Sequence, residues 1–127
     1  MKSFLLILML LSSPSYAQVW VHVVDDTKGV EYYVDQTSIQ PKGSLKSYSQ
    51  LSNYPEGRPY NEKVLNSTVQ FRLTDCVKNN FKTVGMIGYS DFDGKGDIVV
   101  VSSTPDREWV VINMDKITGD VQREVCK

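Results

Sequence analysis

Few residues of this chain could do chemistry, and their spacing argues against a catalytic site. The only histidine, His22, lies in a run of β-branched and aromatic residues at 19–24 (VWVHVV). A histidine base needs a nucleophile and an orienting acid within reach, and no motif here supplies that pair. Neither a glycine-rich phosphate loop nor a basic and aromatic stripe for nucleic acid occurs. We therefore expect no enzymatic activity, and we expect His22 to be a hydrogen-bonded strand residue.

Residues 91–97 (DFDGKGD) carry acidic side chains at alternate positions, as calcium loops do. An EF-hand loop also needs glycine at its sixth position and a bidentate glutamate at its twelfth. Gly96 is sixth from the start of the segment, but Ser102 is twelfth and Lys95 stands where a ligand is needed. The glycines suit positive φ angles, so the segment predicts a connection between two strands and no metal site.

The N-terminus has the three parts of a secretory signal peptide. Lys2 supplies the positive charge, residues 4–11 form an unbroken apolar run, and a small-x-small pattern precedes position 18. The apolar run is far shorter than the roughly 20 residues of a membrane-spanning helix, and no cysteine follows it to accept a lipid. We expect cleavage between Ala17 and Gln18, export to the periplasm or cell surface without a lipid anchor, and one domain at residues 18–127.

The expected mature chain carries no charge excess that would suggest nucleic acid or an anionic membrane as partner. Removing Lys2 from the 14 basic residues leaves 13, against 15 acidic residues. The exported part also holds both cysteines, Cys76 and Cys126. Zinc would need further ligands, and a redox motif would place its cysteines two residues apart. An oxidising compartment and an even count predict a structural disulfide, worth about 4 kcal/mol for a loop of about 50 residues.

β-rich runs alternate with turn-rich breaks along most of the mature chain. The expected strands are residues 19–24, 30–34, 45–51, 67–75, 81–90, 97–102 and 108–112. A two-residue turn at Lys78-Asn79 would place Leu73 opposite Val84 in an antiparallel hairpin. One face of this hairpin is then apolar, whereas the other is mixed and needs a cover.

The end of the chain predicts a helix that could cover that mixed face. Apolar residues recur at helical spacing, with Asn113 or Asp115 as candidate N-caps and Gly119 as a weakening residue; these apolar residues are Met114, Ile117, Val121 and Val125. The sequence thus predicts an α+β, mainly β fold. An antiparallel sheet of about six strands would be tied to a C-terminal helix by the disulfide.

One segment suits recognition of a partner. Residues 53–61 (NYPEGRPYN) are predicted as a loop stiffened by two prolines, and they bring together Tyr54, Arg58 and Tyr60. Tyrosine and arginine are enriched at interface hot spots, and stiffness lowers the ordering cost of binding. The alternative is that the tyrosines pack on the sheet edge and the arginine is solvated.

Taken together, several segments of the mature chain resemble the surface-adhesin protein E family of proteobacteria. Their order and spacing carry the resemblance: Trp20, residues 31–35 (EYYVD), Ser38-Ile39, residues 51–54 (LSNY), Asp75-Cys76, residues 103–105 (STP) before Trp109, and Val125-Cys126. The resemblance implies an antiparallel sheet with a C-terminal helix, and a disulfide between the two matching cysteines.

The resemblance also implies a binding function. The expected partner is another protein, from the host matrix, from plasma or from the bacterial envelope. Because the founding member of the family binds haem, haem is an alternative ligand, with His22 or a tyrosine as axial ligand. A periplasmic inhibitor or immunity protein is a third hypothesis, and a second copy of the chain is a further candidate partner. No resident cofactor is expected.

Overall fold

The computed structural model describes residues 18–105 and 107–127. The predicted signal peptide and its cleavage site at Ala17 fall outside these residues. Within the described part, no helix is both long enough and apolar enough to cross a bilayer.

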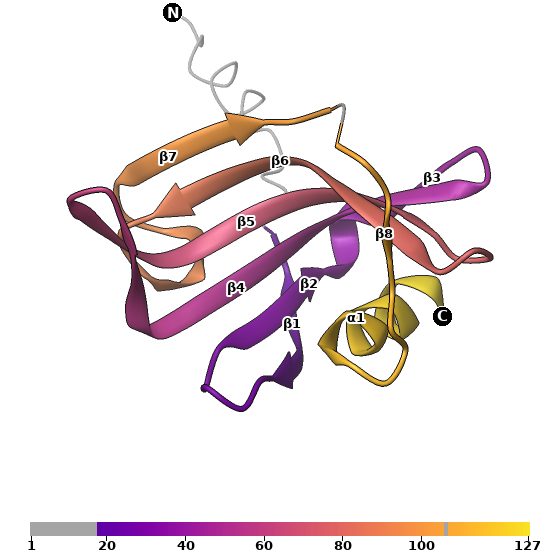
Figure 1. The fold of residues 1–127 in the computed structure, drawn as a ribbon, viewed down its shortest axis with the longest axis horizontal. Helices are drawn as coiled ribbons and strands as arrows, with labels where there is room; N and C mark the ends of the chain where they lie inside the picture. The colour runs from indigo at the N-terminus through magenta and orange to yellow at the C-terminus, as the bar shows by residue number, and fades with distance from the viewer. Residues whose placement is uncertain (1–17, 106) are drawn as a thin grey trace, which may run out of the picture.

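The described chain forms one antiparallel sheet of eight strands with a C-terminal helix against one face (Figure 1). The strand order is β1-β2-β4-β5-β6-β7, and the short strands β3 and β8 pair with β4 and β6. This confirms the predicted mainly β class. The strands are β1 (Trp20–Asp25), β2 (Glu31–Asp35), β3 (Gln40–Lys42), β4 (Leu45–Tyr60), β5 (Lys63–Asp75), β6 (Asn80–Tyr89), β7 (Ile98–Ser103) and β8 (Val110–Val111). The helices are two 3₁₀ turns, η2 (Gln36–Ser38) and η3 (Phe92–Gly94), and α1 (Ile117–Cys126).

Strand β4 continues through the residues predicted as a loop, so the loop prediction for residues 53–61 is wrong. Arg58 and Tyr60 pair with Leu65 and Lys63 of β5, beyond a register shift that begins after Asn53. The extra residues form a bulge, where proline and a glycine with positive φ (Gly57, φ 74) are tolerated. β2 pairs with β4 only up to Asn53. In the described part of the chain, the rest of β4 is therefore unpaired on that side, and a proline there breaks no hydrogen bond to a neighbouring strand.

The β5–β6 hairpin exists as predicted, but its register differs. Leu73 pairs with Lys82 rather than Val84. The cause is a longer turn: the Asp75 side chain accepts hydrogen bonds from the backbone N–H groups of Val77 and Lys78, each at 2.9 Å. The bond from Lys78 contributes most to lowering the pKa of the Asp75 carboxyl. An aspartate-nucleated turn therefore replaced the expected two-residue turn.

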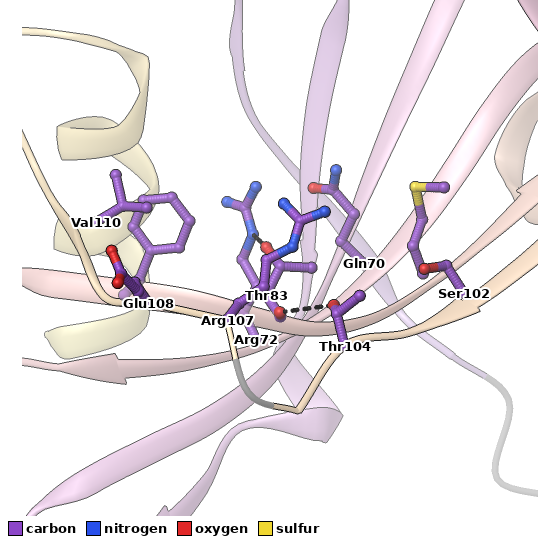
Figure 2. A pocket seen from close by; sticks show the side chains of 10 residues that line it. Gln70, Arg72, Thr83, Ser102, Thr104, Arg107, Glu108 and Val110 are labelled. Carbon is purple, nitrogen blue, oxygen red and sulfur yellow. Dashed lines mark hydrogen bonds between the residues drawn. The ribbon is translucent and has the colours of Figure 1, made fainter.

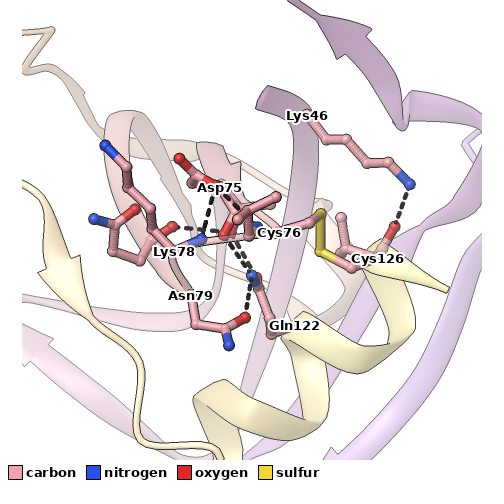
Figure 3. The surroundings of a disulfide bond; sticks show 11 residues. Lys46, Asp75, Cys76, Lys78, Asn79, Gln122 and Cys126 are labelled. Carbon is pink, nitrogen blue, oxygen red and sulfur yellow. Dashed lines mark hydrogen bonds between the residues drawn. A yellow bond between two sulfur atoms is a disulfide. The ribbon is translucent and has the colours of Figure 1, made fainter. Parts of the chain in front are cut away.

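Helix α1 is attached to the sheet mainly through its C-terminal half (Figure 3). The disulfide Cys76–Cys126 confirms the predicted pairing, with a Cα–Cα distance of 5.8 Å. One turn earlier, the buried Gln122 accepts a hydrogen bond from Thr74 Oγ1 at 2.5 Å and donates one to the carbonyl of Asp75 at 3.0 Å. On the same helix, Val121 and Val125 pack into a cluster with Val34 and Tyr48.

The start of α1 differs from the predicted cap. Lys116 is the N-cap residue and makes no side-chain capping bond. Asn113 instead accepts a hydrogen bond from the backbone N–H of Asp115, which shapes the turn before the helix. Gly119 is buried where the helix meets this turn, and a Cβ there would lie 2.3 Å from the carbonyl oxygen of Met114. Close packing, rather than helix propensity, therefore explains the glycine.

Helix propensity alone predicts that alanine at position 119 is more stable than glycine by about 1 kcal/mol. Because of the close approach to Met114, we expect the opposite. Gly119→Ala should lower the free energy of unfolding by about 1–3 kcal/mol, since Met114 must move. The control is Gly85→Ala, whose added Cβ would meet its nearest neighbour at 3.4 Å and should change stability by less than about 1 kcal/mol. Urea unfolding followed by circular dichroism measures both. A Gly119→Ala variant as stable as the parent would contradict the packing described here.

Candidate functional site

The face of the sheet that carries α1 holds many polar side chains. Cross-strand pairing puts Gln50 beside Gln70, Gln70 beside Met86 and Met86 beside Ser102 in one row. The neighbouring row holds Tyr48, Arg72 and Thr83. Directly opposite residues of antiparallel strands share a face, so these side chains lie on the side of Val34, which packs against α1. The helix packs mainly on β1, β2 and β4 and reaches β5 through Gln122, which bonds to Thr74 and Asp75 at the end of that strand.

Arg72 is the centre of this polar face (Figure 2). Its Nη1 donates to Gln50 Oε1 at 2.7 Å and its Nε donates to Thr83 Oγ1 at 3.1 Å. The guanidinium also lies over the ring of Phe81, 4.4 Å from its centroid. Gln50 in turn donates to Gln70 at 3.3 Å. This combination of hydrogen bonds and stacking fixes the charged group in one orientation.

Two adjoining pockets open beside Arg72, and both are lined by Gln70 and Arg72. The pocket toward β7 has a volume of about 280 Å³ and is closed by residues that follow β7. The pocket toward α1 has a volume of about 240 Å³ and reaches Tyr54 and Thr118. Burial raises the pKa of Tyr48 beside them, although Arg72 acts in the opposite direction. Burial, followed by the charge of Asp26, likewise raises the pKa of Tyr32 in the second pocket.

The residues around Arg72 were missed at the level of sequence. The mixed second face of the hairpin was visible as alternating Thr68, Gln70, Arg72 and Thr74. That pattern predicted a face in need of a cover, and α1 covers only part of it. Gln50 and the residues that follow β7 join the site through strand pairing distant in sequence, which the alternation alone does not show.

The structure separates Tyr60 from the other two residues of the predicted binding segment, Tyr54 and Arg58. Tyr54 is only 5% exposed, and its hydroxyl lies 3.0 Å from Thr68 Oγ1. Arg58 stacks over the Tyr54 ring at 4.2 Å from its centroid, so these two side chains belong together at the edge of the pocket near α1. Tyr60 lies apart from them, 40% exposed, beside the turn between β4 and β5.

Tyr60 lies at the end of the β4–β5 hairpin, which we call the hairpin tip: Tyr60, Lys63 and Val99 on one face, and Val64, which pairs with Pro59, on the other. Val64 is 53% exposed, and Tyr60, Lys63 and Val99 line a shallow depression of about 500 Å³. In Figure 1 this end of the β4–β5 hairpin lies at the opposite end of the sheet from α1. The hairpin tip thus places a large aromatic and an aliphatic side chain at a projecting end of the molecule.

His22 is an exposed residue of the edge strand β1, as a hydrogen-bonded strand residue should be. Its Nε2 lies 2.6 Å from Asp25 Oδ1, and its ring meets that of Tyr33 edge-on at 5.2 Å. The expected hydrogen bond is therefore confirmed. Axial ligation of haem by this nitrogen would require the bond to Asp25 to break.

The acidic segment at 91–97 is the predicted connection between two strands, β6 and β7. Positive φ angles occur at Gly94 and Gly96, and also at Asp93. Asp93 exchanges two hydrogen bonds of 2.8 Å with the side chain of Asn53, which ties the connection down onto β4. Within residues 18–105 and 107–127, no group of three or more His, Cys, Asp or Glu side chains is arranged to hold a metal ion.

Comparison with known proteins gives one consistent result. The sequence profile described as surface-adhesin protein E matches residues 20–127. The chain is also similar to crystal form II of Haemophilus influenzae protein E, with a TM-score of 0.64 and 17% identity over 91% of this chain and 94% of that one. Its similarity to protein E from non-typeable Haemophilus influenzae has a TM-score of 0.57 and 15% identity, over 91% and 81%. These likenesses show a shared fold. A search of curated protein sequences gave no match.

The different environments of the two tyrosines predict different roles in stability. Tyr54→Ala should cost about 3 kcal/mol because it empties a buried site, and Tyr54→Phe about 1 kcal/mol because it removes only the hydroxyl and its bonds to Thr68 and Arg58. Tyr60→Ala is the matched control and should cost less than about 1 kcal/mol. Urea unfolding measures all three. Equal losses for Tyr54→Ala and Tyr60→Ala would contradict the burial of Tyr54.

Proposed function

Because the chain belongs to the surface-adhesin protein E family, we propose that it is an exported, non-catalytic protein that binds another protein through the hairpin tip. The partner is a host matrix or plasma protein or a component of the bacterial envelope. Family membership and the predicted signal peptide at residues 1–17 support export. The family description supports a binding role.

The exposure of Tyr60 and Val64 at the end of the β4–β5 hairpin carries this proposal. Tyrosine is among the residues that dominate binding energy at protein interfaces, because it supplies a large contact area at a low entropic cost. Strand pairing holds the tip in place, since Arg58, Pro59 and Tyr60 pair with Leu65, Val64 and Lys63. A tip that is ordered before binding loses little conformational entropy when a partner docks.

Tyr54 and Arg58 take a supporting role in this proposal. The buried Tyr54 ring and its bond to Thr68 anchor the bulged part of β4 that leads to the tip. Arg58 packs over that ring. Direct contact with a partner is therefore assigned to Tyr60 and Val64.

The double variant Tyr60→Ala/Val64→Ser should bind the partner at least tenfold more weakly, since two exposed anchors are lost. The partner is first captured with residues 18–127 from host plasma, matrix and envelope extracts and identified by mass spectrometry. Surface plasmon resonance then compares the affinities of the variants.

Val111→Ser is the matched control because Val111 is 82% exposed but lies at the other end of the sheet, paired with Asn80. It should bind like the parent. Empty captures from all three sources would refute the proposal of a protein partner. Unchanged affinity of the tip variant for a captured partner would refute the assignment to the hairpin tip.

A further inference from the structure

The pocket between Arg72 and the segment that follows β7 plays no part in the protein binding proposed for the hairpin tip. We call it the arginine groove and define it by the residues that carry its polar wall: Gln70, Arg72, Thr83, Ser102, Thr104 and Arg107. It lies on the face of the sheet that carries α1 (Figure 2). The groove is therefore a candidate site for a separate ligand.

Arg72 offers unused donors to this groove. A guanidinium has five N–H donors, and the bonds to Gln50 and Thr83 employ one on Nη1 and the one on Nε. Stacking on Phe81 holds the plane of the group in place. The remaining donors are therefore oriented in advance for a ligand.

The second cation comes from a different part of the chain. After β7, Thr104 bonds to β6 twice, through its N–H to the carbonyl of Val84 at 2.9 Å and through its Oγ1 to the carbonyl of Thr83 at 3.2 Å. The N–H of Arg107 then bonds to the carbonyl of Thr104 at 3.3 Å. These bonds bring Arg107 to the same pocket as Arg72, and Figure 2 shows both side chains extending toward it.

The groove has an excess of positive charge. Among the described residues that line it, Glu108 is the one acidic side chain, against two arginines. The ion pairs of the described residues are His22–Asp25, Arg123–Asp120 and Lys127–Glu124, and they involve none of these three side chains. Two guanidinium groups at one site favour an oxyanion, which can accept several charge-assisted hydrogen bonds at once.

The rest of the wall is apolar and limits the size of the ligand. Phe81, Met86 and Val110 line the same pocket, whose volume is about 280 Å³. Pockets for small molecules combine such apolar walls with a few polar groups that fix orientation. The hydroxyls of Thr83 and Ser102 complete the polar part.

We propose that the arginine groove binds a small organic anion, with a carboxylate or phosphate group held between Arg72 and Arg107 and an apolar body against Phe81, Met86 and Val110. This site is separate from the hairpin tip, so either assignment can fail without the other.

The test uses residues 18–127 and four probes: hexanoate, hexyl phosphate, inorganic phosphate and hexylammonium. Binding is followed by NMR titration, with the Nε–Hε signals of Arg72 and Arg107 as reporters. At least one hexyl anion should bind saturably at millimolar or lower concentration and shift both signals. Saturation by hexanoate alone identifies a carboxylate site, and saturation by hexyl phosphate alone identifies a phosphate site. Failure of both, or equal binding of hexylammonium, would overturn the proposal.

Variants separate the groove from nonspecific charge. Arg107→Gln and Arg72→Gln should each weaken binding at least fivefold, whereas Arg123→Gln on the exposed side of α1 should leave it unchanged. Arg107 is exposed, so its variant keeps the test valid if Arg72→Gln fails to fold. Parental affinity in Arg107→Gln would overturn the proposal. Equal affinity for inorganic phosphate and hexyl phosphate would overturn its apolar part.

Discussion

The attachment of α1 to the sheet through its last two turns is the constraint on which the other features depend. The disulfide Cys76–Cys126 and the bonds of Gln122 to Thr74 and Asp75 fix the helix against the β5–β6 turn. From there, Val121 reaches the cluster around Val34. A helix of ten residues held at this place covers β1, β2 and β4 and cannot also cover β7. The position of the helix thus decides which part of the polar face stays accessible.

A polar sheet face beneath a helix is stable only if its polar groups are satisfied, because an unpaired buried group costs about 1–3 kcal/mol. In the described part of the chain, every buried side-chain nitrogen and oxygen has a hydrogen-bond partner. Gln50 on β4 bonds to both Gln70 and Arg72 on β5, and Arg72 also bonds to Thr83 on β6. Apolar side chains in these positions would have packed against one another and left no pocket. This face instead keeps oriented donors beside two pockets, while the hairpin tip at the far end of the sheet exposes Tyr60 and Val64.

The parts of the fold predicted correctly are those with a local signal or few alternatives. Two cysteines in an exported chain allow a single pairing, and period-two alternation in residues 67–75 identifies a half-buried strand. The errors have a common cause, since each depends on contacts distant in sequence or on one side chain in a turn. Asp75 lengthened the β5–β6 turn and shifted the register, and pairing with β5 extended β4 through a bulge that resembles a loop. The same pairing buried Tyr54 and exposed Tyr60, and it assembled the surroundings of Arg72 from separate strands.

The central claim is that the disulfide and its neighbouring contacts hold α1 in place on an otherwise independent sheet. Hydrogen exchange of residues 18–127, measured with and without reductant, tests this most directly. Reduction removes a cross-link between residues 50 apart in sequence, worth up to about 4 kcal/mol. The account predicts that amides of α1 (Ile117–Cys126) and of β2 (Glu31–Asp35) lose most protection, while the paired centre of β4, β5 and β6 remains the slowest to exchange. Equal protection of α1 in the oxidised and reduced protein would contradict the claim.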